Sequence, residues 1–262
     1  MTGGKIGVVV VGACGRMGRE TCKAVSAAED MSLVGACDVT LVGRGLAEAI
    51  GGDVADVQVR NDLDALIKDC APDVVVDFST PAAVLGNIRT AVGRGVNIVV
   101  GATGLTPADV RSEEQLARES RLGIIIAPNF AIGAVLMMKF AAEAAKHMPA
   151  VEIVELHHDK KLDAPSGTAI ITAEMIAEAR GDVQSPSDQP AARGVEHKGV
   201  RIHSVRLPGL VAHQEVILGG LGQTLTIRHD SLDRTSFMPG VLLAVRKVRE
   251  IKGLVYGLDK IL

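Results

Sequence analysis

Up to about residue 127, short apolar runs rich in β-branched residues alternate with stretches whose apolar positions recur at helical spacing. The runs are apolar on both faces, as expected of parallel strands that are covered by helices on both sides. This pattern predicts βαβ units and an open parallel sheet with right-handed crossovers. The predicted strands cover residues 5–12, 32–38, 73–79, 96–104 and 123–130, and the predicted helices cover 16–29, 61–70, 81–93 and 106–120.

The pattern changes after about residue 130. Three later runs alternate apolar and polar residues, which predicts an antiparallel or mixed sheet with one buried face. The predicted elements are helices at 132–147 and about 167–180, strands at 151–158, 201–209, 212–220 and 223–231, and a last helix at about 236–250. The last helix has a dense apolar pattern and is expected to pack back on the first domain. We therefore expect an α/β fold with one domain at 1–129 plus 235–262 and a second, α+β domain inserted at 130–234.

The composition narrows the classes of function. The chain has 262 residues, of which 47% are hydrophobic, enough for a sizeable core. A net charge of −3, one Tyr and no Trp argue against nucleic-acid binding. No apolar run approaches the roughly 20 residues of a membrane span, and the apolar N-terminus fits a buried strand better than a signal peptide.

The four cysteines form no CxxC pair, which argues against a zinc ribbon or a redox dithiol. Buried, reduced thiols in a cytoplasmic protein are the simplest interpretation.

The stretch "VVVVGACGRMGRE" places Gly12, Gly15 and Gly18 between a predicted strand and a predicted helix, the context that a dinucleotide-binding loop requires. Gly12 permits a tight turn, Gly18 permits close packing of the helix on the strand, and the helix N-terminus offers partial positive charge to a pyrophosphate. The spacing is GxxGxxG rather than GxGxxG, because Cys14 stands at the usual second glycine. By itself this spacing leaves an ordinary loop equally open.

Asp38 ends the second predicted strand, about 20 residues after Gly18. In a Rossmann fold an acid at this point accepts hydrogen bonds from the adenosine ribose hydroxyls. An isolated Asp would be a turn or cap residue, but together with the glycine loop it favours a Rossmann-type nucleotide domain. A carboxylate there also repels a 2′-phosphate, so we expect NADH to be preferred and NADPH to remain possible, with Arg16 and Arg44 as residues that would soften the preference.

Three more predicted strand ends carry turn residues: "DFSTP" at 77–81, "GATG" at 101–104 and "APNF" at 127–130. Ligands of open α/β sheets bind outside the carboxyl ends of the strands. Gly101, Ala102 and Thr103 are small enough to admit a nicotinamide ribose. Ordinary βα loops are the alternative, and for "DFSTP" the two interpretations have equal weight.

The segment "HHDKKLDAPSGTA" at 157–169 concentrates cationic side chains just before a predicted helix. His157 and His158 end an apolar strand, Lys161 follows, and Ser166 is a plausible N-cap. A helix start binds carboxylate or phosphate through its N–H groups, and the neighbouring histidines and lysine add proton donors. Such a site suits a small dianionic substrate that is protonated during the reaction.

Two other interpretations of this segment are a solvated basic loop and a zinc site. Adjacent histidines point in different directions, and no Cys or Glu stands at a usual ligand spacing. We therefore expect no metal.

The motifs "VGACGRMG", "DFSTP", "GATG", "APNFAIG" and "ELHHDKKLDAPSGTA" resemble those of the dihydrodipicolinate reductase family. The resemblance runs from Gly12 to "DRTSFMPG" at 233–240, and its HHxxK…DAPSGTA block is highly specific. It implies reduction of 4-hydroxy-tetrahydrodipicolinate, with loss of water, in the diaminopimelate route to lysine. It also implies a mixed-sheet substrate domain and a homotetramer built through those sheets.

By position, the resemblance makes His157 the catalytic acid/base and Lys161 a proton donor. The implied substrate contacts are His158, Ser166, Gly167 and Thr168. The implied cofactor contacts are Gly12, Ala13, Cys14, Gly15, Arg16, Met17, Asp38, Gly101, Ala102, Thr103, Ala127, Pro128, Asn129 and Phe130. One departure concerns Val39, because the family often has a basic residue there that helps it accept NADPH.

Two rival functions remain at this point. Another two-domain NAD-dependent dehydrogenase, acting on an amino acid or a semialdehyde, explains the nucleotide domain but not the HHxxK…SGT block. A catalytically silent NAD(H)-binding sensor needs the glycine loop but gains nothing from His157 and Lys161 beside a helix start. The sequence leaves open the order of proton transfers between those two residues.

Overall fold

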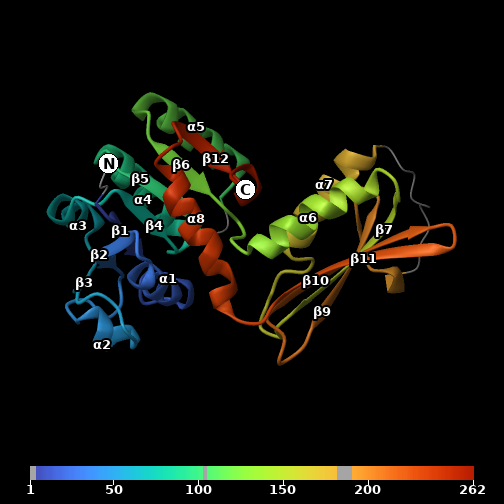
Figure 1. Ribbon diagram of the computed structural model, residues 1–262, viewed down its shortest axis with the longest axis horizontal. Coiled ribbons are helices and arrows are strands. Elements are labelled where there is room, and N and C mark those ends of the chain that lie inside the picture. The colour runs from blue at the N-terminus through green and yellow to red at the C-terminus, as the bar shows by residue number, and fades with distance from the viewer. Residues whose placement is uncertain (1–3, 103–104, 182–190) are drawn as a thin grey trace. The chain divides into compact units, whose positions relative to one another are not determined.

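The computed structural model describes residues 4–102, 105–181 and 191–262. The chain divides into two compact units, Met1–Phe130 with Phe237–Leu262, and Ala131–Ser236 (Figure 1). The assignment of nucleotide binding to the first unit and of substrate binding to the second stays a prediction.

The first unit contains a seven-stranded sheet in which all the strand pairs are parallel, in the order β12-β6-β5-β4-β1-β2-β3. The predicted parallel sheet is confirmed. Two short strands, β3 and β12, were not predicted, and β3 has only two residues, too few to show a period. The strands are β1 (Ile6–Val11), β2 (Met31–Cys37), β3 (Val59–Arg60), β4 (Val74–Asp77), β5 (Asn97–Val100), β6 (Gly123–Ile126) and β12 (Gly253–Tyr256).

Helices cover both faces of this sheet. One face carries α1 (Arg16–Ala27) and α8 (Met238–Val248), and the other carries α3 (Leu63–Cys70), α4 (Pro81–Gly93) and α5 (Pro107–Ser120). The short α2 (Leu46–Ile50) follows β2. Helix α8 packs on β4, β5 and β6, so the prediction that the last helix returns to the first domain is confirmed.

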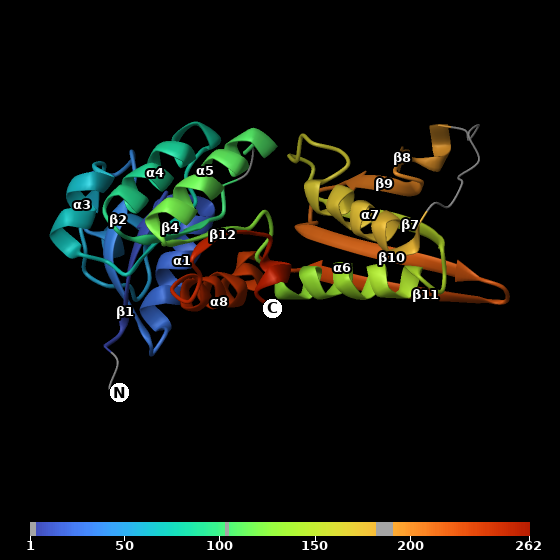
Figure 2. The same cartoon turned by 90° about the horizontal axis from the view of Figure 1, so that it is seen from above.

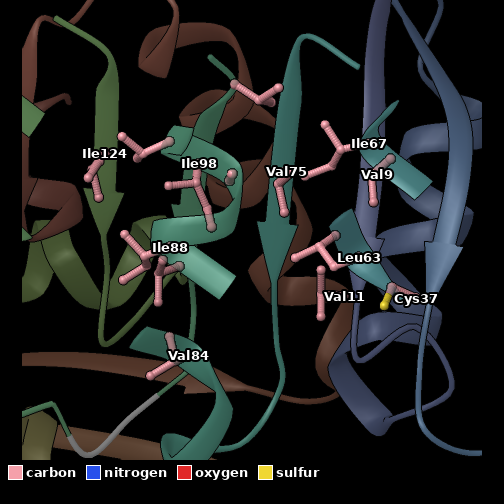
Figure 3. Close-up of a cluster of buried hydrophobic side chains, with 14 of the residues drawn as sticks. Val9, Val11, Cys37, Leu63, Ile67, Val75, Val84, Ile88, Ile98 and Ile124 are labelled. Atoms are coloured by element: carbon pink, nitrogen blue, oxygen red, sulfur yellow. The ribbon is translucent and has the colours of Figure 1, made fainter. Parts of the chain in front are cut away.

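Apolar side chains fill the layer between the sheet and helices α3 and α4 (Figure 3). Val84 and Ile88 project from α4, and Leu63 and Ile67 from α3, toward valines and isoleucines of the strands. Full burial of one such side chain stabilises the fold by about 1.5–3 kcal/mol. The strand residues of this cluster include Val9, Val11, Val75, Ile98 and Ile124.

The carboxyl ends of five strands meet at one edge of the sheet. The last paired positions are Val11 with Cys37 and Asp77, Asp77 with Val100, and Val100 with Ile126. The ladder continues one residue further, because Gly12, Phe78, Gly101 and Ala127 each donate an N–H to a neighbouring strand. The turns that follow β1, β2, β4, β5 and β6 therefore emerge side by side.

The second unit has a mixed five-stranded sheet in the order β11-β10-β7-β9-β8, in which only the β7–β9 pair is parallel. Helices α6 (Ile132–Ala145) and α7 (Gly167–Arg180) pack side by side on one face (Figure 2). This confirms the predicted mixed sheet with one buried face. The strands are β7 (Ala150–His157), β8 (Val195–His197), β9 (Val200–Arg206), β10 (Ala212–Gly220) and β11 (Gln223–Ser231).

Strand β8 lies in the polar stretch that the sequence left without an element. The described residues also contain three short 3₁₀ segments: η1 (Ala191–Arg193), η2 (Arg234–Phe237) and η3 (Leu258–Lys260). Within the described ranges no helix has both the length and the apolar character needed to cross a membrane.

Candidate active site

The glycine loop between β1 and α1 is built by close approach of backbone to backbone. Gly12 has φ +72°, and a Cβ atom there would lie 2.6 Å from the carbonyl oxygen of Phe78. A Cβ atom at Gly18 would lie 2.0 Å from the carbonyl oxygen of Gly12. Only glycine fits either position, which confirms the tight turn and the close packing of helix on strand.

The N–H groups of the loop itself are already used within the protein. Gly12 and Ala13 donate to the carbonyl of Cys37 at 2.8 and 3.2 Å, Cys14 donates to Asp38 Oδ2 at 2.8 Å, and Gly15 donates to the carbonyl of Gly12 at 3.0 Å. The next N–H groups, of Arg16 and Met17, open helix α1 and have no hydrogen-bond partner among the described residues. An anion at this loop would therefore be held by the first turn of α1.

Asp38 stands at the end of β2 with a fixed carboxylate. One oxygen accepts the N–H of Cys14, and the other accepts the N–H and the hydroxyl of Thr40 at 2.9 and 2.8 Å. Oδ2, which accepts only the N–H of Cys14, keeps capacity for a further donor, such as a hydroxyl. Val39, which follows it, is 88% exposed.

A cavity of about 800 Å³ lies in the first unit beside Asp38. It is lined by the ends of β1 and β2, the start of α3, the turn after β4 and one face of α4. Its charged lining residues are Asp38, Asp62 and Asp64, and none of the described lining residues is Lys or Arg. This lining fits the neutral hydroxyls and base of an adenosine and opposes a phosphate.

Phe78 was not predicted as a site residue, but it shapes the edge where β4, β5 and β6 end. Its ring meets that of Phe130 edge-on, with centroids 5.7 Å apart and planes at 63°. A Cβ atom at Gly101 would lie 2.1 Å from the Phe78 ring. The small size of Gly101 thus makes room for this ring, whereas the sequence suggested that it makes room for a ribose.

The other predicted residues of this edge are placed as follows. Ala102 and Ala127 are buried, Asn129 is half-buried and Pro128 is exposed. Thr103 lies outside the described residues.

The residues of "DFSTP" have different surroundings. Asp77 is buried and accepts hydrogen bonds from Ser79 N at 2.7 Å and Asn87 Nδ2 at 2.9 Å. Burial raises its pKa, and the hydrogen bonds from Ser79 and Asn87 oppose that rise. Asp77 therefore shapes the turn, while Phe78, Ser79 and Thr80 line the cavity.

In the second unit, His157 ends strand β7 and its side chain is 13% exposed. Its Nδ1 contacts a carboxylate oxygen of Glu155, a buried residue on the same face of the strand. Glu155 also accepts hydrogen bonds from both terminal nitrogens of Arg206, at 2.9 and 2.8 Å, and from Ser166 N at 3.3 Å.

Burial alone would raise the pKa of Glu155, but hydrogen bonds from His157, Arg206 and Ser204 outweigh it and lower the pKa to about 2. The side chain is therefore a carboxylate at neutral pH, inside the protein.

Lys161 lies in the loop after β7, where its ammonium group contacts both carboxylate oxygens of Asp163 at 2.8 Å. Arg206 Nη2 donates to the backbone carbonyl of Asp163 at 2.7 Å. Arg206 thus joins the two predicted proton donors, through Glu155 to His157 and through Asp163 to Lys161. The structure brings them into one network without a direct contact between them among the described interactions.

The start of helix α7 has the predicted cap. Ser166 Oγ accepts the N–H of Ala169 at 3.2 Å, while its own N–H is taken by Glu155. Gly167 is exposed at the first helical position, and Thr168 is half-buried. Helix α7 thus begins directly after this cap, with Gly167 and Thr168 as its first two residues.

His158 is half-buried, and its carbonyl accepts the N–H of Lys161 at 3.2 Å. Asp159 and Lys160 are exposed, as expected of solvated residues. Over the described ranges, no group of three or more His, Cys, Asp or Glu side chains is arranged to hold a metal ion.

Sequence reasoning missed Glu155, Asp163 and Arg206. Glu155 had a signal, because an acid two residues before His157 lies on the buried face of the same strand. Arg206 had none, because it stands 51 residues from Glu155 and reaches it only through the parallel pairing of β9 with β7.

Comparisons with known proteins agree with this geometry. Family models described as "Dihydrodipicolinate reductase, N-terminus" and "Dihydrodipicolinate reductase, C-terminus" match residues 6–130 and 133–262. The chain belongs to the dihydrodipicolinate reductase family.

Members of the dihydrodipicolinate reductase family resemble this chain over nearly its whole length. The 4-hydroxy-tetrahydrodipicolinate reductase of Syntrophomonas wolfei is 52% identical, covering 98% of this chain and 99% of its own. That of Listeria welshimeri is also 52% identical, over 97% of this chain and 99% of its own. A dipicolinate-bound dihydrodipicolinate reductase from Paenisporosarcina sp. TG-14 superposes with a TM-score of 0.86 at 46% identity, covering 98% of this chain and 100% of its own.

The first unit has a Rossmann-type fold, which supports a nicotinamide cofactor. The fit of the residues to that group rests on the glycine cradle, the unpartnered amides of α1 and the acid-lined cavity.

The buried carboxylate of Glu155 predicts a pH dependence of stability. Its pKa of about 2 lies below the ordinary 4.5, so its contribution is complete above about pH 4.5 and is lost as the pH falls toward 2. At about 1.4 kcal/mol per pKa unit, the contribution is on the order of 3 kcal/mol. Urea unfolding should show wild type more stable than Glu155→Gln at neutral pH, with a gap that narrows below about pH 4.5. A gap that stayed constant down to about pH 3 would contradict this assignment.

Proposed function

We propose that this protein reduces 4-hydroxy-tetrahydrodipicolinate to tetrahydrodipicolinate, with loss of water, in the diaminopimelate pathway of lysine biosynthesis. The observation that carries the proposal is the network at the end of β7, where His157 and Lys161 are held beside the start of α7. The names of the relatives support the same reaction. Another dehydrogenase activity would leave this network and the HHxxK…SGT block unexplained.

The cofactor is held, in this proposal, at the carboxyl edge of the parallel sheet. The first turn of α1, at Arg16 and Met17, binds the pyrophosphate, and Asp38 accepts the ribose hydroxyls. The remaining proposed contacts are Gly12, Ala13, Cys14, Gly15, Gly101, Ala102, Thr103, Ala127, Pro128, Asn129 and Phe130. When bound, the reduced nicotinamide supplies the hydride.

The substrate is a small dianion, and its carboxylates need donors. We assign one carboxylate to the N–H groups of Gly167 and Thr168, with the Thr168 hydroxyl and His158 as further contacts and Ser166 as the cap that holds this turn in place. Reduction of the conjugated imine leaves negative charge on the atom conjugated to the carbon that is reduced. A proton donor beside that atom accelerates the step by about 10²–10⁴-fold, and His157 and Lys161 are the assigned donors.

Asp163 gives Lys161 a defined position before substrate arrives. Its carboxylate contacts the ammonium group through both oxygens, and the pair is partly exposed. A substrate carboxylate at the same ammonium group competes with Asp163 rather than with water.

The proposed cofactor preference is NADH over NADPH. Asp38, Asp62 and Asp64 line the cavity. Val39 stands at the position after the ribose acid, where the family often has a basic residue. Arg44 lies outside the lining and contacts Glu48 at 3.7 Å. A 2′-phosphate in this cavity would meet carboxylates without a facing cation.

We also propose a homotetramer built through the mixed sheet. The face of this sheet opposite α6 and α7 carries Val154, Leu156, Val205 and Ile217, which stay partly exposed, among charged side chains. A sheet face of apolar and charged residues that no described helix covers suits association with the same face of another copy.

The thiols fit a reducing compartment, and a cytoplasmic location is part of the proposal. All four cysteines are unpaired. Burial raises the pKa of Cys22 to about 12 and that of Cys37 to about 11, so both stay protonated and unreactive.

The catalytic assignment predicts a separation of turnover from cofactor binding. His157→Gln or Lys161→Ala should lower turnover by about 10²–10⁴-fold, because each removes a proton donor, while NADH affinity is unchanged. NADH oxidation should be followed with substrate freshly generated by the preceding synthase step. Lys160→Ala, which changes an exposed neighbouring lysine, should keep wild-type turnover.

Near-normal turnover in both donor variants would overturn these roles. Tight NADH binding by the wild type, with no consumption, would favour the rival function of a silent NAD(H) sensor.

The ribose assignment predicts opposite effects of two neighbouring substitutions. Asp38→Ala should weaken NADH by about tenfold, since a hydrogen bond to a charged group contributes about 1.5–3 kcal/mol, and should weaken NADPH less. Val39→Arg should strengthen NADPH alone by pairing with its 2′-phosphate. Titration of both nucleotides measures this, with Val42→Arg, an exposed valine outside the cavity, as control. A wide preference of the wild type for NADPH would refute the argument.

The oligomer assignment predicts particles of four chains, each of 27.3 kDa, in sedimentation at micromolar concentration. Ile217→Glu on the open sheet face should dissociate them, whereas Leu221→Glu in the exposed β10–β11 turn should not. A monomer for the wild type would rule out the proposed tetramer.

A further inference from the structure

We propose that Glu155 and Arg206 form a positioning pair for the reductase site. Glu155 holds the His157 ring with its proton on Nδ1, and Arg206 ties the same carboxylate to the loop that carries Lys161. The inference rests on the proposed function for the roles of His157 and Lys161, and it adds two residues that touch neither substrate nor cofactor in that proposal.

Glu155 occupies a buried position of strand β7. Strand β7 places residues 151, 153, 155 and 157 on the face covered by α6 and α7, and Glu155 is 0% exposed there. A carboxylate in such a place needs charged and hydrogen-bonding partners from within the protein. His157, Arg206 and the N–H of Ser166 supply them.

The contact with Glu155 determines which ring nitrogen of His157 carries the proton. A carboxylate only accepts hydrogen bonds, so the ring nitrogen that faces it must carry a hydrogen. In the neutral ring the proton is then on Nδ1, and Nε2 is the nitrogen left to exchange a proton with a ligand. The low pKa of Glu155, about 2, keeps it an acceptor at neutral pH.

Arg206 contacts both Glu155 and the loop that carries Lys161. Its two terminal nitrogens donate hydrogen bonds to the two carboxylate oxygens of Glu155. Nη2 also donates to the backbone carbonyl of Asp163, whose carboxylate contacts the Lys161 ammonium group. The next residue, Leu207, donates its N–H to the carbonyl of His157 at 3.1 Å. The end of β9 therefore fixes both the ring-bearing strand end and the lysine-bearing loop. A lysine at 206 lacks the planar fork for these bonds.

Another Glu–His pair in the same unit, Glu174 with His197, shows why burial of the carboxylate matters for the state of the ring. Glu174 contacts His197 at 3.2 Å and Lys198 at 3.3 Å, but its side chain is 41% exposed. Water competes for both partners there, so that pair imposes no single ring state. Glu155 differs in having no access to water and in being held by Arg206.

The wild-type protein provides a direct test of the ring state. In full-length chain labelled with ¹⁵N-histidine, ring resonances report which nitrogen is protonated, and the His157 signals are those missing from His157→Gln. We expect His157 to be protonated on Nδ1 in its neutral form. A neutral ring protonated on Nε2 would overturn the proposal, whatever the outcome of the activity assays.

A double-mutant cycle tests whether Glu155 acts through His157. Glu155→Gln should lower kcat by about 10²-fold with NADH affinity unchanged, and adding it to His157→Gln should cause little further loss. Losses that multiply in the double variant, or a wild-type kcat for Glu155→Gln, would contradict the proposal. Glu174→Gln is the matched control and should keep wild-type kcat.

If Glu155→Gln does not fold, Arg206→Lys replaces it in the cycle, since it keeps the charge next to Glu155 but loses the fork. It should lower kcat by about tenfold or more, again without further loss in the His157→Gln background. Additive loss would count against the proposal. A wild type that binds NADH but does not turn over would refute the proposed function instead, and the ring-state measurement would still decide this inference.

Discussion

A carboxylate without access to water has to be compensated inside the protein, and in the second unit this constraint falls on Glu155. Its partners come from strand β9, from the end of its own strand and from the start of α7. Removing one member of a buried pair typically costs about 3–5 kcal/mol, because the remaining charge is left uncompensated. Three chain segments are therefore held in one arrangement, and this arrangement presents the histidine, the lysine loop and the start of α7.

The first unit depends on a different kind of constraint, the close approach of backbone to backbone. Helix α1 can begin beside the sheet edge only because Gly18 meets the carbonyl of Gly12 without a side chain between them. The apolar core shown in Figure 3 fixes the strands, and their common register brings five turns to one edge. The amides that open α1, the carboxylate of Asp38 and the Phe78–Phe130 pair then take their places from where each strand ends.

The two units differ in the charge of the residues at their candidate sites. The cavity of the first unit is lined by carboxylates, and no Lys or Arg is among its described lining residues. In the proposed function it therefore holds the uncharged parts of a dinucleotide, and backbone amides hold the pyrophosphate. The second unit gathers His157, His158, Lys161 and a helix N-terminus, which suits a dianion that gains a proton. Arg206, although cationic, is not available to the ligand, since Glu155 and Asp163 occupy both of its terminal nitrogens.

The sequence by itself determined the α/β class, most element positions, the glycine loop and the segment at 157–169, because these depend on local periodicity and on neighbours in the chain. The cap at Ser166 and the turn at Gly12 were predictable for the same reason. Only the tertiary structure decided that the Phe78 ring fills the space over Gly101 and that Cys14 donates to Asp38. It also decided that Arg206 lies beside Glu155, because strand pairing, which local pattern does not encode, joins residues 51 positions apart.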